Sequence, residues 1–224
     1  LCIATGFFLF VGMGLQQYSL QKSQISNAAF LSTLYVPFVG LISRIFFKKK
    51  LHWIVWLAIL LCLYGSYLLS VNQSLDVKKS DSLLFIAAFF FALHIIFIDV
   101  FMKKINSPFI FGSCQYFCVF LFSLIVALTL ENPKISNIQI EWFEILYTGI
   151  FSAGVGYTLQ IMAQHKASPA PAAIILSMES VFATIAGWMI LNQTLDINKT
   201  LGCIAIFSGV IIVQFIPIYL KSYR

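Results

Sequence analysis

Charge is what this sequence has least of. Only 10% of its 224 residues are charged, whereas 60% are hydrophobic and 16% are aromatic. A water-soluble domain carries about 25% charged residues, so this chain has too little polar surface to coat a globule in water. The shortage excludes an ordinary soluble domain and predicts that lipid is the main solvent of the chain.

Sequence signatures of metal, redox, ATP-driven and hydrolytic chemistry are missing as well. There are only three histidines and no His-Glu-x-x-His sequence, so a zinc protease is unsupported. The five cysteines lie inside apolar runs, and their spacing suggests neither zinc nor disulfides. No Gly-x-Ser-Gly sequence indicates an intramembrane serine protease, and no glycine-rich phosphate loop indicates ATP as the direct driver. We therefore expect no cofactor, no metal and no enzymatic activity.

The formal net charge of +6 does not indicate nucleic acid. The basic residues stand in short clusters between apolar runs, without a basic face or arm. That pattern is typical of membrane orientation rather than of a nucleic-acid footprint. The sequence therefore predicts contact with a lipid bilayer and none with nucleic acid.

Long apolar runs fill most of the chain. A spanning helix needs about 20 mostly apolar residues, and eight runs qualify. Short loops join them, so neighbouring helices should be antiparallel. The predicted fold class is an all-α polytopic membrane protein with eight transmembrane helices. We place these helices at residues 1–20, 26–47, 53–71, 82–102, 107–130, 142–165, 169–191 and 197–220.

The basic residues favour one side of this topology. One side receives nine of the 14 Lys and Arg residues: Arg44 near the end of its helix, and eight more in the loops at 48–52, 103–106 and 165–168 and near the C-terminal end. The other side receives five. Because cytoplasmic loops carry an excess of Lys and Arg, we predict a multi-pass protein in which both ends of this chain face the cytoplasm.

The first three predicted helices resemble the last three. A shift of 144 residues superposes them with eleven identities in about sixty positions and no gap. Polar and glycine matches, such as Gln16 with Gln160 and Gly65 with Gly209, are the hardest to attribute to apolar composition. The paired helices run in opposite directions, so the repeat is inverted. An inverted repeat is a recurring plan of secondary transporters, with the substrate site near the midplane.

The repeat also predicts a missing piece. Two helices precede 142–165 in the second half, and nothing corresponding precedes the first helix. We therefore expect a ten-helix protein built from two inverted units of five helices, of which this chain is a fragment. Residues 1–71 are then the remainder of the first unit, three helices without the first two, and residues 82–220 are the five-helix second unit.

Short motifs in both halves carry a family resemblance. They are Gly14–Leu20, Asn27–Leu31, Val36–Phe38, Gly156-Tyr157, Ala170–Ala173 and Ser177–Phe182. Together with the five-plus-five plan, they resemble the EamA-type transporters of the drug/metabolite transporter superfamily over nearly the whole chain. The resemblance implies a carrier in the plasma (inner) membrane that moves amino acids, nucleobases or other small metabolites, often outward. Ser180 stands where family members often have a proline.

One acidic residue lies near the bilayer centre. Glu179 is eleven residues into the run 169–191, and a charge at such depth is costly and usually functional. Its helical face also carries Ala172, Ala183 and Ala186, so a neighbouring helix can approach closely. We interpret Glu179 as a group that binds substrate or protons. The alternative is a protonated, structural glutamic acid that is hydrogen-bonded to another helix.

Four further polar residues complete the predicted site. His94 is a candidate proton partner, and a satisfied interhelical histidine is the alternative. Gln115, Tyr116 and Tyr157 are candidate hydrogen-bonding groups of a substrate cavity, and simple packing is their alternative role.

Two pairs of polar residues are related by their spacing. Gln16 and Gln160 match in the repeat and lie near opposite ends of their helices, so we interpret them as gating residues, with ordinary helix–helix hydrogen bonding as the alternative. Asp99 lies four residues before Lys103, and an ion pair along one helix explains it.

We therefore predict a secondary transporter of amino-acid-like or related small metabolites that works by alternating access, with export as a candidate direction. A small-molecule substrate and the bilayer are the expected partners, and protons and a second copy of the chain are further candidates. The alternatives are a non-transporting integral membrane partner or assembly protein and an intramembrane enzyme. The inverted repeat favours the carrier over both.

Overall fold

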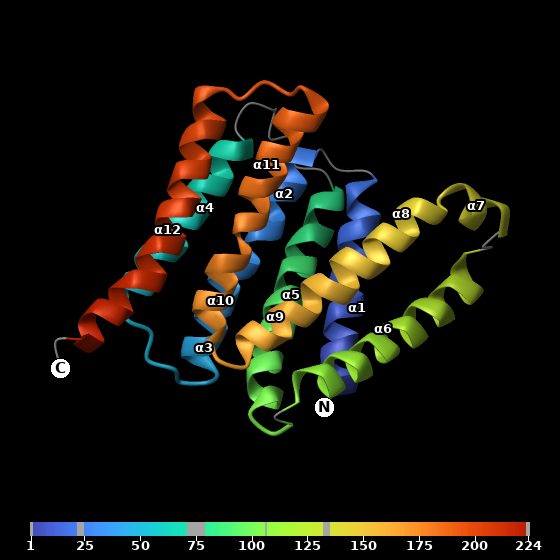
Figure 1. Cartoon of the computed structure of the whole chain (residues 1–224), viewed down its shortest axis with the longest axis horizontal. Helices are drawn as coiled ribbons and strands as arrows, with labels where there is room; N and C mark the ends of the chain where they lie inside the picture. Colours follow the sequence, from blue (N-terminus) through green and yellow to red (C-terminus); the bar gives the residue numbers. More distant parts are fainter. Residues whose placement is uncertain (1, 22–24, 71–78, 106, 132–134, 223–224) are drawn as a thin grey trace. The chain divides into compact units, whose positions relative to one another are not determined.

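The computed structural model describes residues 2–21, 25–70, 79–105, 107–131 and 135–222, and every regular element within these ranges is a helix (Figure 1). Six helical stretches are long and apolar enough to cross a membrane in this part of the chain. They match the last six predicted spans closely, which confirms the all-helical prediction. They are Trp53–Ser70, Ser82–Met102, Pro108–Leu130, Trp142–Gln164, Pro169–Ile190 and Ile197–Phe215.

The other two predicted spans take shorter or less apolar forms. Residues 1–20 correspond to α1 (Cys2–Leu20), whose C-terminal part carries Gln16 and Gln17. Residues 26–47 are divided between α2 (Ile25–Thr33) and α3 (Tyr35–Ile45). The count of eight spanning helices and the ten-helix plan therefore stay predictions.

The chain forms two compact units that are interleaved along the sequence. Unit 1 comprises Leu1–Phe10 and Phe97–Ala167, and unit 2 comprises Val11–Ile96 and Ser168–Arg224. Neither boundary coincides with the two predicted repeats, because packing joins helices that belong to different repeats.

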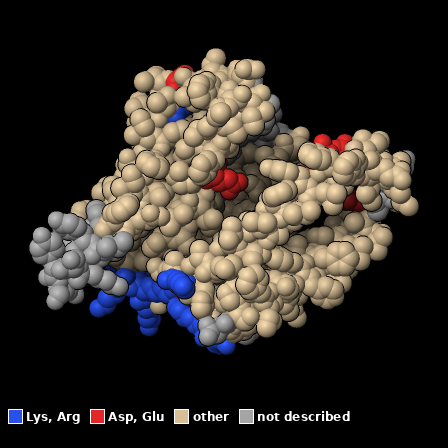
Figure 2. All heavy atoms as spheres, in the orientation of Figure 1, with Lys and Arg blue, Asp and Glu red and all other residues tan. Residues whose placement is uncertain are grey.

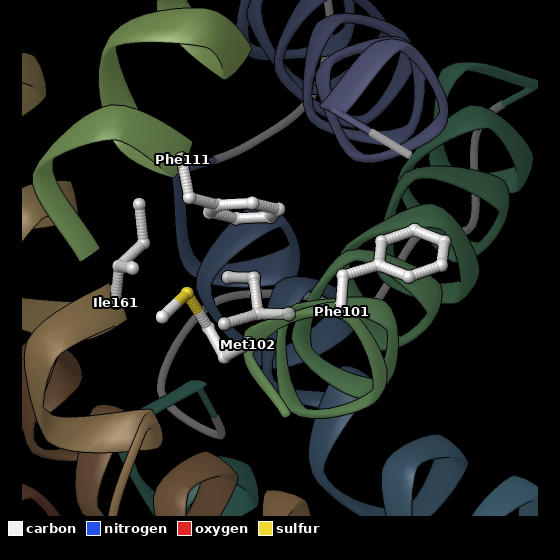
Figure 3. Close-up of a cluster of buried hydrophobic side chains, with 5 residues drawn as sticks. Phe101, Met102, Phe111 and Ile161 are labelled. Atoms are coloured by element: carbon white, nitrogen blue, oxygen red, sulfur yellow. The ribbon is translucent and has the colours of Figure 1, made fainter. Parts of the chain in front are cut away.

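Unit 1 is built around a small apolar core. Figure 3 shows the side chains that form it: Ile98, Phe101, Met102, Phe111 and Ile161 are all buried and pack together. They come from three helices, the consecutive α5 and α6 and the later α9, which the core holds together. The helices of unit 1 after α1 are the end of α5 (Lys79–Met102), α6 (Pro108–Leu130), α7 (Ile135–Ile140), α8 (Trp142–Tyr147), η1 (Thr148–Gly156) and α9 (Tyr157–Gln164).

A π-helix interrupts the last long helix of unit 1. The nine residues of η1 lie between α8 and α9, and all three together make one candidate span. π-helical bonding is rare, usually limited to one turn, and frequent at functional sites. The residues matched to η1 by the 144-residue shift are 4–12, and they are α-helical in α1. Paired segments of the repeat thus adopt different helical forms.

Unit 2 contains the remaining part of α1, the first part of α5, and the helices α2 and α3. It also contains α4 (Trp53–Ser70), α10 (Pro169–Leu176), α11 (Met178–Leu191) and α12 (Ile197–Ser222). Helices α4 and α12 lie side by side along their lengths (Figure 1). The aromatic ring of Phe38 packs edge-on against Phe85 and Phe89 of α5, with centroid distances of 5.0 and 6.0 Å. Small residues and aromatic edges therefore hold this unit together.

Two breaks divide helices of unit 2, and each has a local cause. Pro37 has no N–H group to donate to the carbonyl oxygen of Thr33, so α2 cannot continue into α3. In the other case no proline is needed: Ser177, between α10 and α11, donates its hydroxyl to the carbonyl oxygen of Ile174 at 2.6 Å. Such a bond competes with the helical ladder and bends a helix. The helix is therefore interrupted even though Ser180 stands where the resemblance leads us to expect a proline.

The outer surface is apolar. Figure 2 shows one face on which uncharged residues cover nearly everything. Large hydrophobic side chains are exposed along whole helices, including Leu130, Ile140 and Ile190. Apolar exposure on this scale is not sustained in water and marks a surface for another apolar medium. Lipid is the expected covering.

Candidate functional site

Glu179 lies at the centre of an interrupted span. It is in the first turn of α11, two residues after the break at Ser177, and midway along the stretch Pro169–Ile190. Its side chain is exposed. Among the described residues, none forms a hydrogen bond or an ion pair with its carboxyl group. The partner that a purely structural glutamic acid requires is thus missing from the described part of the chain.

The break that presents Glu179 is itself well packed. Ser177 is buried, and its hydroxyl lies 3.3 Å from the sulfur atom of Cys62 on α4. A buried hydroxyl with two contacts holds the local backbone in one arrangement. On the helical face of Glu179, Ala172 is buried, whereas Ala183 and Ala186 are exposed. Described residues therefore cover only the first part of this face, and close approach of a helix to its second part stays a prediction.

Three predicted site residues lie in unit 1. The hydroxyl groups of Tyr116 and Thr158 are 3.0 Å apart, and this hydrogen bond joins α6 to α9. Gln115 is completely buried on α6, and Tyr157 is half-buried as the first residue of α9. The side chain of Ile161 approaches Gly112 closely, so the two helices pack tightly just beside the hydroxyl pair. The hydroxyl pair of Tyr116 and Thr158 is the polar contact shown here, and the role of Gln115, Tyr116 and Tyr157 in substrate binding stays a prediction.

His94 lies in unit 2, as Glu179 does. It is buried on α5 and takes part in an interaction with the surrounding protein. No ion pair joins His94 to Glu179 in the described structure. The proposed proton exchange between them therefore remains a hypothesis.

The two residues predicted as gates make different hydrogen bonds. Gln16 donates from its Nε2 atom to the Ser32 hydroxyl at 3.3 Å, which links α1 to α2. Gln160 donates from its Nε2 atom to Oε1 of Gln164 at 3.2 Å, within α9. The first bond is the helix–helix contact of the alternative interpretation, and the second lies within a single helix. Gating by either residue stays a prediction.

The ion pair predicted at the end of α5 is present. The Nζ atom of Lys103 lies 3.1 Å from Oδ2 of Asp99, four residues earlier. The buried carboxylate is thus paired along its own helix, and a transport role is not needed to explain Asp99.

The 144-residue shift also appears in the backbone. Helices α3 and α11 are each followed by a left-handed residue, Lys48 with φ 49° and Asn192 with φ 52°. In both cases the next N–H group donates to a carbonyl oxygen six residues earlier, at 3.0 and 3.1 Å. A left-handed residue after a helix, with a bond that reaches back to the last turn, is a common way to end a helix. The breaks at Leu34 and Ser177 also match under the shift to within one residue, and the inverted repeat itself stays a prediction.

Comparison with known proteins identifies the family. The model of the EamA-like transporter family matches residues 1–71 and 78–215. The chain belongs to this family. As an EamA-like chain with six membrane-length helices, it is a multi-pass membrane protein.

The curated relatives of this EamA-like chain are named uncharacterized transporters. A protein of Archaeoglobus fulgidus is 28% identical over 93% of this chain. Proteins of Clostridium kluyveri and Bacillus subtilis are each 24% identical, over 90% and 92% of this chain. The alignments span 67% of the length of each of these three relatives. The activity of the whole protein is therefore a matter for proposal.

A solved crystal structure has the same fold. It agrees with this EamA-like chain at a TM-score of 0.80 with 14% identity, over 98% of this chain and 77% of the solved chain. At that identity the likeness shows the fold alone.

Sequence reasoning missed several polar partners. Ser177 and Thr33 occupy matched positions at the two helix breaks, and this shared hydroxyl is a signal that could have located both breaks. Ser32 and Thr158 are the partners of Gln16 and Tyr116. They had no signal in the sequence, because nothing local specifies which helix faces which.

Proposed function

We propose that this EamA-like chain is part of a secondary carrier that moves small, amino-acid-like metabolites across the plasma membrane by alternating access. The observation that carries the proposal is Glu179, an exposed carboxyl group midway along an interrupted span, which no residue in the described part of the chain pairs. Membership of a transporter family and relatives named as transporters support it. No described group of His, Cys, Asp and Glu side chains can hold a metal ion.

The position of Glu179 suits two steps of transport. A carboxylate can bind the amine of an amino-acid-like substrate, or it can take up and release a proton when a water-filled cavity opens to it. The broken helix α10–α11 supports this role because discontinuous helices line the substrate sites of many carriers. The first turn of α11 also favours a negative charge through the helix dipole. The amine of the substrate and a proton would thus compete for the carboxylate of Glu179.

Flux in proteoliposomes tests the proposed function. We expect the full-length protein to accelerate the movement of labelled amino acids or related amines down their gradient, with saturation as concentration rises. Vesicles containing an unrelated membrane protein are the control. A non-transporting partner protein would give no saturable flux with any metabolite in a broad mixture. An intramembrane enzyme would give a chemically changed product in detergent, without a gradient.

We also propose an inverted, ten-helix plan with Gln16 and Gln160 near opposite ends of the pathway. The shared helix ends at Lys48 and Asn192 support the inversion, because α3 and α11 then end in the same way on opposite sides of the membrane. Gln16 and Gln160, with the residues around each of them, would then close the two ends of the pathway alternately.

We expect the loops at 48–52, 103–106 and 165–168 and the C-terminal end to be cytoplasmic. The loops at 21–25, 72–81, 131–141 and 192–196 should be external, although parts of the first three lie outside the described residues. The physical basis is the excess of Lys and Arg on the first side. Single cysteines introduced at His52 and Thr194 should react with an impermeant maleimide from inside and from outside, respectively. Reaction of the His52 position from outside intact cells would reverse the orientation.

A further inference from the structure

Two backbone contacts join α4 to α12 in unit 2. A methyl group added to Gly65 would lie 2.6 Å from the carbonyl oxygen of Gly202, and one added to Gly202 would lie 2.7 Å from that of Gly65. Further along, a methyl group on Gly209 would lie 3.0 Å from the carbonyl oxygen of Ala58. Residue numbers rise on one helix as they fall on the other, so the helices are antiparallel. A backbone carbonyl oxygen is among the nearest atoms at each contact, and the side chains of Ile206, Leu69 and Cys62 lie close beside it.

The 144-residue shift exchanges these two contacts. Adding 144 to Gly65 gives Gly209, and subtracting 144 from Gly202 gives Ala58. The pair Gly65–Gly202 therefore maps onto the pair Gly209–Ala58, and the two contacts are equivalent in the repeat. They are not equal, because Ala58 carries a methyl group where its mate Gly202 has none, and the glycine pair leaves less room. The contacts Gly65–Gly202 and Ala58–Gly209 are thus related by the repeat, and the helices lie closer together at the first.

We propose that the α4–α12 crossing is the pivot of the carrier, at which the two contacts tighten and loosen in opposition as access alternates. This inference rests on the proposed carrier function. In a carrier with inverted repeats, one repeat rocks against the other around a fixed site. The two repeats then exchange their conformations, so the tighter contact moves from Gly65–Gly202 to Ala58–Gly209. Helices in backbone contact can tilt about such a point without moving large side chains aside.

Added methyl groups provide the test. Gly65→Ala forces the helices apart at one contact, and Gly209→Ala does so at the other. The two variants should therefore favour states that face opposite sides of the membrane. The double variant adds a methyl group at both contacts, so it should restore the parent's ratio of inward-facing to outward-facing states. Ala58→Gly adds no atom and lets its contact close further, so it should shift the balance in the same direction as Gly65→Ala.

The measurement is the accessibility of a midplane cysteine in the full-length protein in proteoliposomes. Ser180→Cys places the probe beside Glu179, in a background in which Cys2, Cys114 and Cys203 are serine. Labelling rates with an impermeant maleimide are compared between the two sides. The ratio should change by about threefold or more, in opposite directions, for Gly65→Ala and Gly209→Ala. Gly14→Ala is the matched control, because no heavy atom lies within 4 Å of the added methyl group.

Each outcome decides the proposal. Opposite shifts with a rebalanced double variant support the pivot, whereas shifts in the same direction, or unchanged ratios, overturn it. If the glycine variants fail to fold, Ala58→Gly decides alone, and an unchanged ratio in it overturns the pivot. Saturable flux in the parent together with unshifted variants means that only the pivot is wrong. A parent without saturable flux for any metabolite means that the carrier function itself is wrong.

Discussion

Replacing Glu179 by glutamine is expected to lower saturable flux by about tenfold or more, which corresponds to ~1.4 kcal/mol of lost binding or coupling free energy. Glutamine keeps the shape and hydrogen-bonding capacity of the side chain, so the protein should fold. It cannot carry a negative charge or release a proton, so the variant should also lose the part of the pH dependence that Glu179 causes. Glu179→Ala should be more damaging, because it also removes the polar group.

The measurement is a pH series of flux in proteoliposomes that contain matched amounts of full-length protein. Glu144→Gln is the matched control, since Glu144 is an exposed acid near the start of another membrane-length stretch and has no predicted site role. If Glu179→Gln equals the parent at every pH and substrate concentration, Glu179 is structural and the site lies elsewhere. Equal losses from Glu144→Gln would point to a general effect of acidic residues.

Truncating Phe111 is expected to destabilise unit 1 more than any other single change in its apolar core. Its side chain is 0% exposed and packs with Met102 and Ile161 (Figure 3). In water-soluble cores a Phe→Ala change costs about 3–5 kcal/mol. In a bilayer the transfer part of that cost is small, because lipid is as apolar as the core. The lost van der Waals contacts remain, so we expect a loss of ~1–3 kcal/mol.

Thermal unfolding in detergent measures this loss. Phe109→Ala is the matched control, because Phe109 is two residues earlier on the same helix and 63% exposed. Phe111→Ala should lower the unfolding temperature clearly, and Phe109→Ala should leave it nearly unchanged. Equal shifts in the two variants would mean that the packing of Phe111 does not stabilise the unit.

A hydrogen bond also bears on whether Tyr116 serves substrate binding or simple packing in unit 1. The hydrogen bond between Tyr116 and Thr158 joins two helices, so both residues serve packing whether or not a substrate meets them. Glu179 has no such structural duty in the described part of the chain. For this reason a transport defect without a folding defect is expected at Glu179, and it is the sharper test of the site.

The sequence by itself determined the solvent and the outline of this protein. Low charge and long apolar runs specify membrane-length helices, because any other arrangement would leave backbone groups unpaired in lipid. The Asp99–Lys103 pair could also be read directly, since residues four apart on one helix are neighbours. The repeat was predicted in the same way from matched residues, and it stays a prediction, with left-handed residues at the matched positions Lys48 and Asn192.

Only the tertiary structure decided the features that depend on which helix faces which. The break at Ser177 depends on a bond to Ile174 and on packing against Cys62, and neither partner can be identified from the sequence around Ser177. The π-helical form of η1, in residues whose repeat mates are α-helical, has no local signature. Apolar helices of similar composition can pack in many ways, because lipid and protein interiors are equally apolar. The close fit of glycines and the pairing of buried hydroxyls select one arrangement, and both are properties of the folded chain.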